Sequence, residues 1–565
     1  MAGQQPIAGA AVTLYAAGTT GNGSAPTALL SASLTTDANG VFSVPAGYVC
    51  PTTNSLIYAV AQGGQTAASG EANAGISLAA VLGACGSLTT GASVTINEAT
   101  TAATVYAMAQ FLSADGNGAT ATNSNGLLLA AATAANLVNT ATGTAPGASF
   151  PSTGTPPTAK INSLANLLNA CVISADTSDP CTSLYSATGS ASGSVTDTFT
   201  AAINIVKQPG NNVAALYTLS RASSVYSPAL TAAPADWTLA VNYGGGGMNA
   251  PSAVAVDSTG KLWVANYYAV ASFFTNTGVP VFANGITGDD LDNSYSGAVD
   301  TNDNFWSVNE ESSSVNNGLG SISVLNNTGG LNGVYTSGGI DFPLGIAFDT
   351  CGGAWIANYG QSTVTRLNQT GTPLSGAAGY SSASLVFPVA VATDANCNAY
   401  LANQSSNTIT RVLADGSAFT DFTVGNGPSG LAIDASGNIW SANYYGDSIG
   451  LVSSSGAVLS GTGYTGGGIY HPQGIAADGN GNVWVANYLG PALSELAGAS
   501  ATTPGAILSP PAGWAPDSGL SKAFGLAIDA GGNIWVTSFA TNLLTEFVGL
   551  AVPVQTPQLG PVRIP

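Results

Sequence analysis

The C-terminal part of the chain, from about residue 236 onward, repeats one unit seven times. Each copy contains x-Ala-x-Asp, a turn rich in Gly or Asn, an aromatic residue six positions after the Asp and, in six copies, Asn nine positions after it. The marker aspartates are Asp257, Asp300, Asp349, Asp394, Asp434, Asp478 and Asp529, and they recur at intervals of 40 to 51 residues. Units of this length hold three or four short strands, so the repeat predicts a seven-bladed β-propeller.

The register of the repeat also predicts how the blades pack. The aromatic residue, Trp440 in the fifth copy, falls at one position of the second strand, and we expect it to pack between adjacent blades. Ala432 and its equivalents lie on the inner strand, where crowding near the axis requires small side chains. The last copy lacks a clear fourth strand, so we expect residues 237–243 to complete the seventh blade. The Pro-rich residues 551–565 should run over the surface.

Two further regions precede the repeat. Residues 1–92 alternate apolar and polar residues between Gly, Asn and Asp turns, which predicts a small β-sandwich. Within it, "TTDANGVFSVP" reads as a turn followed by a strand. Residues 93–232 contain about four Ala-rich segments with helical spacing and predict a small α-helical domain. The expected fold is mainly β: a propeller over 236–550, preceded by a sandwich and a helical domain.

The repeat units "PSGLAIDASGNIWSAN", "HPQGIAADGNGNVWVAN" and "FGLAIDAGGNIWVTS" resemble NHL-repeat and streptogramin-lyase-like (virginiamycin B lyase-like) propellers. The resemblance implies the blade architecture. The segments "GAAVTLY" and "TDANGVFSV", with Asp37, Gly40 and Phe42, resemble carboxypeptidase-regulatory-like (transthyretin-like) modules of bacterial surface proteins. Such modules are mostly spacers. The strand that usually precedes them is not visible, and an open sheet edge would allow self-assembly through this module.

Charge and cysteine content restrict the classes of partner and compartment. Eight Lys and Arg residues stand against 28 Asp and Glu residues, a net charge of −20, so binding to nucleic acid or to an anionic membrane is not expected. No apolar run reaches the length of a membrane-spanning helix, so no membrane insertion is expected. The six cysteines predict three disulfides, Cys50–Cys85, Cys171–Cys181 and Cys351–Cys397, and an oxidising compartment. With no visible signal peptide at "MAGQQPIAGA", we expect the mature form of a secreted, extracellular or cell-surface protein.

The loops that follow the second strand of each blade, together with those that precede the inner strand, should form one face of the propeller. This face is rich in Asn and Tyr and almost free of Lys and Arg. Tyrosine rings can stack on the faces of sugars while amide groups bond their hydroxyls; the alternative is that each Asn ties its own loop and each Tyr packs the rim. The candidate ligand-binding residues are Tyr267, Tyr268, Tyr359, Gln404, Tyr444, Tyr445 and Tyr488.

The second blade departs from the other copies by carrying acidic residues in both of its loops. An oxygen-rich cluster of this kind suits Ca²⁺ or Mg²⁺, and the alternative is a solvated acidic rim. The candidate metal ligands are Asp289, Asp290, Asp292, Glu310 and Glu311.

His471 is the single histidine of the chain, and it is expected on the same face. The resemblance to streptogramin lyases implies a His general base, a carboxylate and Mg²⁺, for which His471 and Glu310 are the candidates. The family's second histidine has no counterpart here, which argues against that activity. Three functions therefore remain open: a binding protein whose propeller face engages a polysaccharide or a protein partner, a metal-assisted lyase or hydrolase, and a structural surface or filament subunit.

Overall fold

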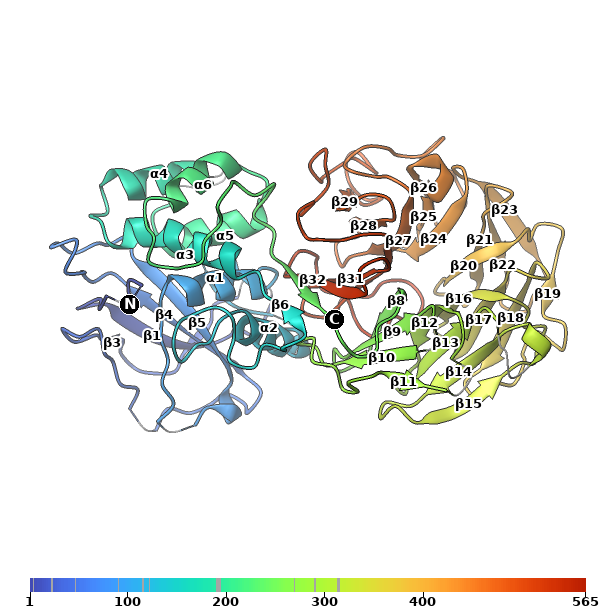
Figure 1. The fold of residues 1–565 in the computed structure, drawn as a ribbon, viewed down its shortest axis with the longest axis horizontal. Helices are drawn as coiled ribbons and strands as arrows, with labels where there is room; N and C mark the ends of the chain where they lie inside the picture. Colours follow the sequence, from blue (N-terminus) through green and yellow to red (C-terminus); the bar gives the residue numbers. More distant parts are fainter. Residues whose placement is uncertain are drawn as a thin grey trace. The chain divides into compact units, whose positions relative to one another are not determined.

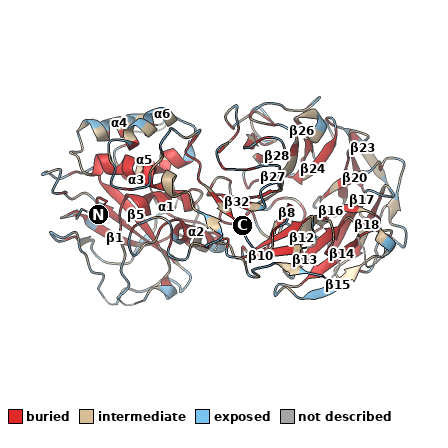
Figure 2. Ribbon diagram, in the orientation of Figure 1, coloured by how far each residue is buried: buried red, intermediate tan, exposed pale blue. Residues whose placement is uncertain are grey.

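The computed structural model describes residues 1–3, 5–21, 24–45, 47–89, 91–113, 116–120, 122–189, 195–268, 270–288, 291–311 and 316–565 (Figure 1). The chain divides into two compact units. The first comprises Met1–Val241 and Phe547–Leu550, and the second comprises Asn242–Glu546 and Ala551–Pro565. The central strands and helices of both units are largely buried (Figure 2).

The first unit contains a five-stranded antiparallel sheet in the order β2-β1-β4-β5, with β3 also paired to β1. Its strands are β1 (Ala11–Ala16), β2 (Thr27–Ala28), β3 (Leu34–Thr35), β4 (Leu56–Gln62) and β5 (Ser77–Ala84). The prediction of a strand after the turn at Asp37 was wrong, because residues 41–45 form no strand. The Asp37 side chain accepts hydrogen bonds from the amides of Asn39 and Val41, at 2.8 and 2.9 Å, and so holds this segment as an irregular loop.

Six helices of the described residues lie between 98 and 220. They are α1 (Glu98–Ala107), α2 (Ser124–Leu137), α3 (Thr158–Val172), α4 (Asp179–Thr188), α5 (Thr198–Lys207) and α6 (Val213–Ser220). Helix α1 begins at an Asn97 cap, whose side chain accepts from the amide of Thr100. The hydroxyls of Thr101 and Thr104 in α1 accept hydrogen bonds from the amides of Ala79 and Val81 in β5. Helix α1 therefore satisfies backbone groups that the end strand of the sheet would otherwise leave unpaired.

The second unit confirms the seven-bladed propeller, with one antiparallel sheet per blade. Blades 1 to 4 contain four strands each: β8 (Pro251–Val256), β9 (Leu262–Asn266), β10 (Val270–Phe274) and β11 (Ile286–Thr287); β12 (Ser294–Val299), β13 (Phe305–Asn309), β14 (Ser321–Leu325) and β15 (Leu331–Tyr335); β16 (Pro343–Phe348), β17 (Gly353–Asn358), β18 (Thr363–Asn368) and β19 (Tyr380–Ser381); β20 (Pro388–Thr393), β21 (Ala399–Asn403), β22 (Thr408–Val412) and β23 (Phe419–Thr423).

Blades 5 and 6 contain three strands each: β24 (Pro428–Ile433), β25 (Ile439–Asn443) and β26 (Ser448–Val452); β27 (Pro472–Ala477), β28 (Val483–Asn487) and β29 (Leu493–Leu496). The segment "AVLSGTGY", residues 457–464, has the sequence of an outer strand for blade 5, but in the structure it forms only isolated bridges at Val458 and Tyr464. Between them Gly461 and Gly463 adopt positive φ, which interrupts the extended conformation that a strand needs.

The seventh blade combines β30 (Ala523–Ile528), β31 (Ile534–Ser538) and β32 (Leu543–Phe547) with β7 (Ala240–Tyr243), which lies next to β32. The Tyr243 hydroxyl donates to the buried Glu546 carboxylate at 2.7 Å, and the Thr545 hydroxyl donates to Asn242 Oδ1 at 2.7 Å. The first and last strands of the repeat array are thus joined by side-chain bonds as well as by the sheet.

The marker aspartate explains why the repeat keeps its register. In every blade its Oδ1 accepts hydrogen bonds from the backbone amides two and four residues later, which fixes the turn between the first two strands. In five blades its Oδ2 also accepts from the indole of the tryptophan six residues on, as Asp434 does from Trp440 at 3.2 Å. Trp440 packs with Ile475 and Val483 of the next blade, which confirms the predicted packing between blades.

The inner strands surround an axial channel of about 260 Å³. Small residues are needed there, because a Cβ added at Gly430 would lie 2.2 Å from the Gln473 carbonyl oxygen. We call the side of the propeller with the marker turns the lower face and the opposite side the upper face. The C-terminal segment crosses the lower end of the channel: the amides of Gly560 and Val562 donate to carbonyls of blades 3 and 5, and the Thr556 hydroxyl donates to the Asp257 carbonyl of blade 1.

Candidate ligand-binding face

The upper face is built from three positions that recur in each blade. The entry position is the residue before the inner strand, the mouth position is the second residue of that strand, and the exit position is the residue after the second strand. The entry residues are Ala250, Asn293, Phe342, Phe387, Gly427, His471 and Lys522. The mouth residues are Ser252, Tyr295, Leu344, Val389, Ser429, Gln473 and Phe524, and all of them line the channel. The exit residues are Tyr267, Glu310, Tyr359, Gln404, Tyr444, Tyr488 and Phe539.

Backbone hydrogen bonds hold the entry and exit positions in the same arrangement, whichever side chains these positions carry. All seven entry residues have φ between 44° and 67°, the left-handed region. In six blades the amide of the exit residue donates to the carbonyl of the entry residue, with N–O distances of 2.8 to 3.1 Å. Because the backbone alone makes these bonds, the side chains at the entry and exit positions are free to differ among blades.

The asparagines that end the second strands are buried and donate hydrogen bonds within their own blades. Asn443 is fully buried, and its Nδ2 donates to the Ser448 hydroxyl at 3.2 Å. Its equivalents make the same kind of bond within their own blades, as when Asn358 donates to Thr363 and Thr365. The alternative interpretation, that each of these asparagines forms hydrogen bonds within its own loop, is therefore confirmed.

Five of the predicted ligand-binding residues, Tyr267, Tyr359, Gln404, Tyr444 and Tyr488, occupy exit positions. The other two, Tyr268 and Tyr445, directly follow exit residues and are 53% and 59% exposed.

Aromatic rings from adjacent blades touch along this face. Tyr470 and Tyr444 both meet the His471 ring edge to face, with centroids 4.9 and 4.8 Å apart. Tyr444 lies 5.9 Å from Tyr488, which lies 6.1 Å from Phe524. We call the set Tyr444, Tyr445, Tyr470 and Tyr488 the tyrosine band. Tyr470 is 48% exposed, so the band presents ring surface to solvent from blades 5 and 6.

His471 belongs to a structural contact between neighbouring blades. Its amide donates to Asp447 Oδ1 at 2.7 Å. Blades without histidine make the same contact, since the amides of Phe387, Gly427 and Ala250 donate to Ser362, Asn407 and Asn542 at 3.1, 2.8 and 2.7 Å. These acceptors, like Asp447, stand four residues after the end of the second strand, with positive φ. We call this contact the inter-blade clip.

The predicted catalytic pair, His471 and Glu310, comes from blades 6 and 2. The carboxylate beside the imidazole is Asp447, whose Oδ1 lies 3.2 Å from Nδ1 without the geometry of a hydrogen bond. Glu310 instead accepts a hydrogen bond from the Tyr267 hydroxyl at 3.3 Å. Its half-buried position raises the pKa of the Glu310 carboxyl, a shift that the Tyr267 bond opposes.

Sequence reasoning missed Asp447 and Tyr295. Asp447 could have been found from its spacing, because Ser362, Asn407 and Asn542 follow the second strand at the same distance. Tyr295 was missed because only small residues were expected on the inner strands, whereas the mouth position accepts large ones.

The predicted metal ligands are only partly within the described residues, since Asp289 and Asp290 lie outside them. Asp292, Glu310 and Glu311 do not form, in the described part of the chain, a group whose carboxylate oxygens all lie within 4.8 Å of one another. Glu311 accepts a hydrogen bond from Asn293 Nδ2 at 3.2 Å.

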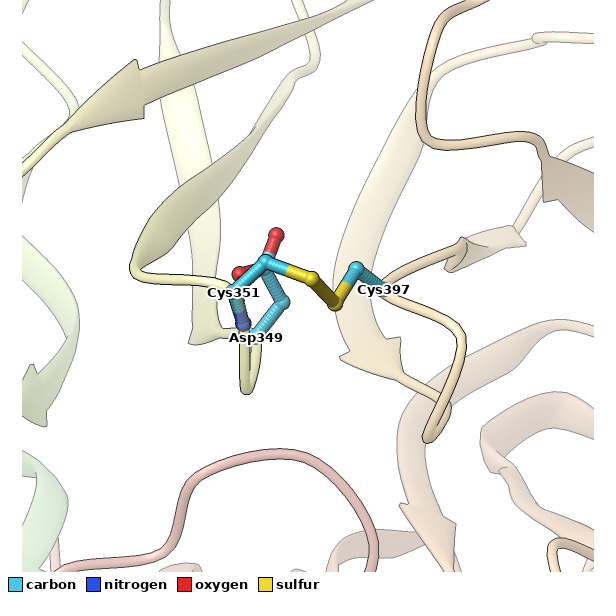
Figure 3. Close-up of side chains that lie close together, drawn as sticks. All are labelled: Asp349, Cys351 and Cys397. Carbon is cyan, nitrogen blue, oxygen red and sulfur yellow. Dashed lines mark hydrogen bonds between the residues drawn. A yellow bond between two sulfur atoms is a disulfide. The ribbon is translucent and has the colours of Figure 1, made fainter.

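One group of three potential ligands does meet that distance among the described residues: Asp349, Cys351 and Cys397 (Figure 3). Its two sulfurs are joined as the predicted disulfide between blades 3 and 4. The Asp349 carboxylate is bound by Arg366 at 2.6 Å and by the Trp355 indole at 2.9 Å. Oxidised sulfurs and an ion-paired carboxylate make this a structural link and not a metal centre.

The other two predicted disulfides, Cys50–Cys85 and Cys171–Cys181, are confirmed, and no free cysteine remains. Three disulfides are typical of proteins in an oxidising, extracytoplasmic environment. Among the described helices, none combines the length and apolarity that crossing a membrane requires.

Comparison with protein-family descriptions gives no match, and comparison with curated protein sequences gives none either. Solved structures do resemble the chain. Virginiamycin B lyase from Staphylococcus aureus is 16% identical, with 55% of this chain and 98% of that chain covered and a TM-score of 0.43. The extracellular domain of the putative hybrid two component system BT3049 from B. thetaiotaomicron is 17% identical, covering 56% of this chain and 41% of that one, with a TM-score of 0.41.

The WD40 repeats of RRP9 are 11% identical, covering 53% of this chain and 94% of that one, with a TM-score of 0.41. With TM-scores of 0.43 or less, these likenesses support no specific function for this chain.

Proposed function

We propose that this is an exported binding protein whose upper propeller face holds a neutral polysaccharide. The tyrosine band is the observation that carries the proposal. Tyr445 and Tyr470 are 59% and 48% exposed although each carries a large ring that would gain free energy from burial. Large aromatic rings gathered on a surface are typical of interaction sites.

The polar groups and charges of the face favour an uncharged, hydroxyl-rich ligand over a nucleic acid or a phosphorylated one. Lys522 is the one Lys or Arg among the entry, mouth and exit residues, and its ammonium lies 5.6 Å from the centroid of the Tyr488 ring. Gln404 and Gln473 supply amide groups that can donate to and accept from sugar hydroxyls. The rings can stack on the apolar faces of sugars beside these amides.

The lyase hypothesis gains less support from the same face. It needs His471 as a general base, but His471 occupies an entry position that Phe342 and Phe387 fill in other blades, and its amide takes part in a clip that does not depend on imidazole. The geometry therefore accounts for His471 without catalysis.

The proposal is tested by binding to a panel of soluble neutral polysaccharides in affinity electrophoresis. The variant Tyr445→Ser/Tyr470→Ser should lose retardation by the polymer that retards the wild-type protein. A matched control, Leu374→Ser/Leu459→Ser, changes two residues that are 49% and 48% exposed outside the three sets of positions, and it should bind normally. Equal retardation of both variants would refute the proposal, as would the absence of retardation by every polymer.

A further inference from the structure

Four aromatic residues and one carboxylate form a continuous row at blades 7, 1 and 2. Tyr267 lies 6.3 Å from Phe539, Phe539 lies 5.9 Å from Phe524, and Phe524 lies 5.3 Å from Tyr295. At one end of this row, Glu310 accepts a hydrogen bond from the Tyr267 hydroxyl at 3.3 Å. Burial, followed by the nearby charge of Glu310, raises the pKa of the Tyr295 phenol. We call these five residues the aromatic box.

Blade 1 adds no large side chain to this row at its entry and mouth positions. Its entry and mouth positions hold Ala250 and Ser252, two of the smallest side chains at those positions. Ser252 is buried, and its hydroxyl donates to the Ser294 carbonyl at 2.6 Å, so it lies against the inner strand of the next blade. Ser252, Tyr295 and Phe524 all line the mouth of the axial channel. The aromatic box therefore borders the mouth of the axial channel, where blade 1 places a small side chain.

The charge of the box is unbalanced in the free protein. Within the described part of the chain, no ion pair involves Glu310. Lys522, the one Lys or Arg among the entry residues, has its ammonium over the Tyr488 ring of blade 6. A half-buried carboxylate without a cationic partner is costly, and a ligand cation would remove that cost.

We propose that the aromatic box binds an alkylated ammonium group. Aromatic ring faces attract such cations, and the attraction is larger when the site is partly shielded from water. The carboxylate of Glu310 supplies the opposite charge, and the net charge of −20 favours the approach of cations. This binding goes beyond the proposed polysaccharide binding, because it uses residues outside the tyrosine band and a different kind of ligand.

Choline and its uncharged isostere, 3,3-dimethyl-1-butanol, test the proposal by titration calorimetry on the full chain. The two molecules have the same shape, and only choline carries the positive charge. Choline should bind saturably and at least about tenfold more tightly than the isostere, which corresponds to the magnitude of a shielded cation–π contact. Equal affinities, or no saturable binding of choline, would overturn the proposal whatever the result with polysaccharides.

Three variants locate the binding. Glu310→Gln should weaken choline binding about tenfold while leaving the isostere unaffected, and Phe539→Leu should weaken choline binding by removing one aromatic ring of the box. Tyr359→Leu is the matched control, because Tyr359 is an exit residue that stacks on Phe387 in another part of the ring. Unchanged melting temperatures would show that the variants are folded. Normal choline binding by Glu310→Gln or Phe539→Leu, or weakened binding by Tyr359→Leu, would contradict the assignment.

The pH dependence provides a second readout, since the charge of choline does not titrate. Affinity for choline should fall as the pH is lowered through the raised pKa of Glu310, because protonation removes the negative charge of the box. The fall should begin at a higher pH than for an exposed glutamate and should be absent in Glu310→Gln. A fall of equal size in Glu310→Gln would assign the effect to another group and reject the role of Glu310.

Discussion

The lower and upper faces of the propeller use the same repeat in opposite ways. At the lower turns the side chains themselves make the bonds, so Asp recurs in every blade, with Trp or Tyr six residues later. At the upper face the backbone makes the recurring bonds, and the residues vary: the entry positions hold residues as different as Gly and Phe, and the exit positions hold Glu, Gln, Tyr or Phe. Repetition of a residue in this chain therefore marks a structural role, and variation at a repeated backbone position marks a position available for binding.

The largest effect that separates the two faces should come from the aromatic residue between blades. Trp440→Ala should lower the free energy of unfolding by about 3–5 kcal/mol, because Trp440 is fully buried between blades 5 and 6. Tyr444→Ala, four residues later on the upper face, should lower it by about 1 kcal/mol or less. Chemical denaturation of both variants measures this difference. Similar losses of unfolding free energy in the two variants would contradict the proposed difference between the two faces.

The disulfide of the lower turns should have the next largest effect. Cys351→Ala/Cys397→Ala opens a loop with a sequence separation of 46 residues and should cost about 2–4 kcal/mol. Ser436→Ala changes the corresponding turn of blade 5, where no disulfide exists, and serves as the control. Thermal unfolding of the three proteins tests this expectation, and equal melting temperatures for all of them would show that the link does not stabilise blades 3 and 4.

A buried glutamate in blade 6 should make stability depend on pH. Burial, and then the charge of Asp478, raises the pKa of Glu495 to about 7, while hydrogen bonds from the Trp514 indole and Asn482 lower it. Because the pKa is raised in the folded state, the stabilising contribution is complete below the ordinary glutamate pKa of 4.5 and is lost as the pH rises through about 7.

Glu495→Gln removes this charge and leaves an acceptor for the Trp514 indole. The variant should match the wild type near pH 4.5 and exceed it by up to roughly 3 kcal/mol above pH 8. Denaturation curves across this range measure the effect. A variant that is less stable than the wild type at every pH would show that Glu495 contributes mainly through its hydrogen bonds.

The smallest effect is expected at His471. His471→Phe should change the free energy of unfolding by no more than about 0.5 kcal/mol, because Phe342 and Phe387 occupy the same left-handed position in blades 3 and 4. Asp447→Ala should cost about 1 kcal/mol, since it removes the acceptor of the clip. If His471→Phe proved the more damaging change, the imidazole would have a role that the clip does not explain.

The propeller could be predicted from the sequence because its structural residues are the repeated ones. The spacing of Asp and Trp gave the blades and their packing, and the positions of Cys351 and Cys397 in neighbouring turns gave the disulfide. The irregular segment after Asp37 could not be predicted in the same way. A single copy of a turn offers no second example against which its continuation can be compared.

For the upper face, the positions of residues could be predicted but their contacts could not. The exit tyrosines could be predicted because they follow a repeated Asn, but the spacing did not show which of these rings would be in contact. The contacts of Tyr444 with His471 and of Phe524 with Tyr295 join residues of different blades. Such contacts depend on how each ring turns at a mouth or entry position, and no spacing in the sequence records that orientation.

The central claim is that the upper face of the propeller is the binding surface. Chemical footprinting of tyrosines, with and without the polysaccharide that retards the protein, tests it most directly. We expect Tyr445 and Tyr470 to become protected, and Tyr217 of the first unit and Tyr380 of blade 3 to stay as reactive as before. Protection of Tyr217 or Tyr380 with no change at Tyr445 and Tyr470 would contradict the account.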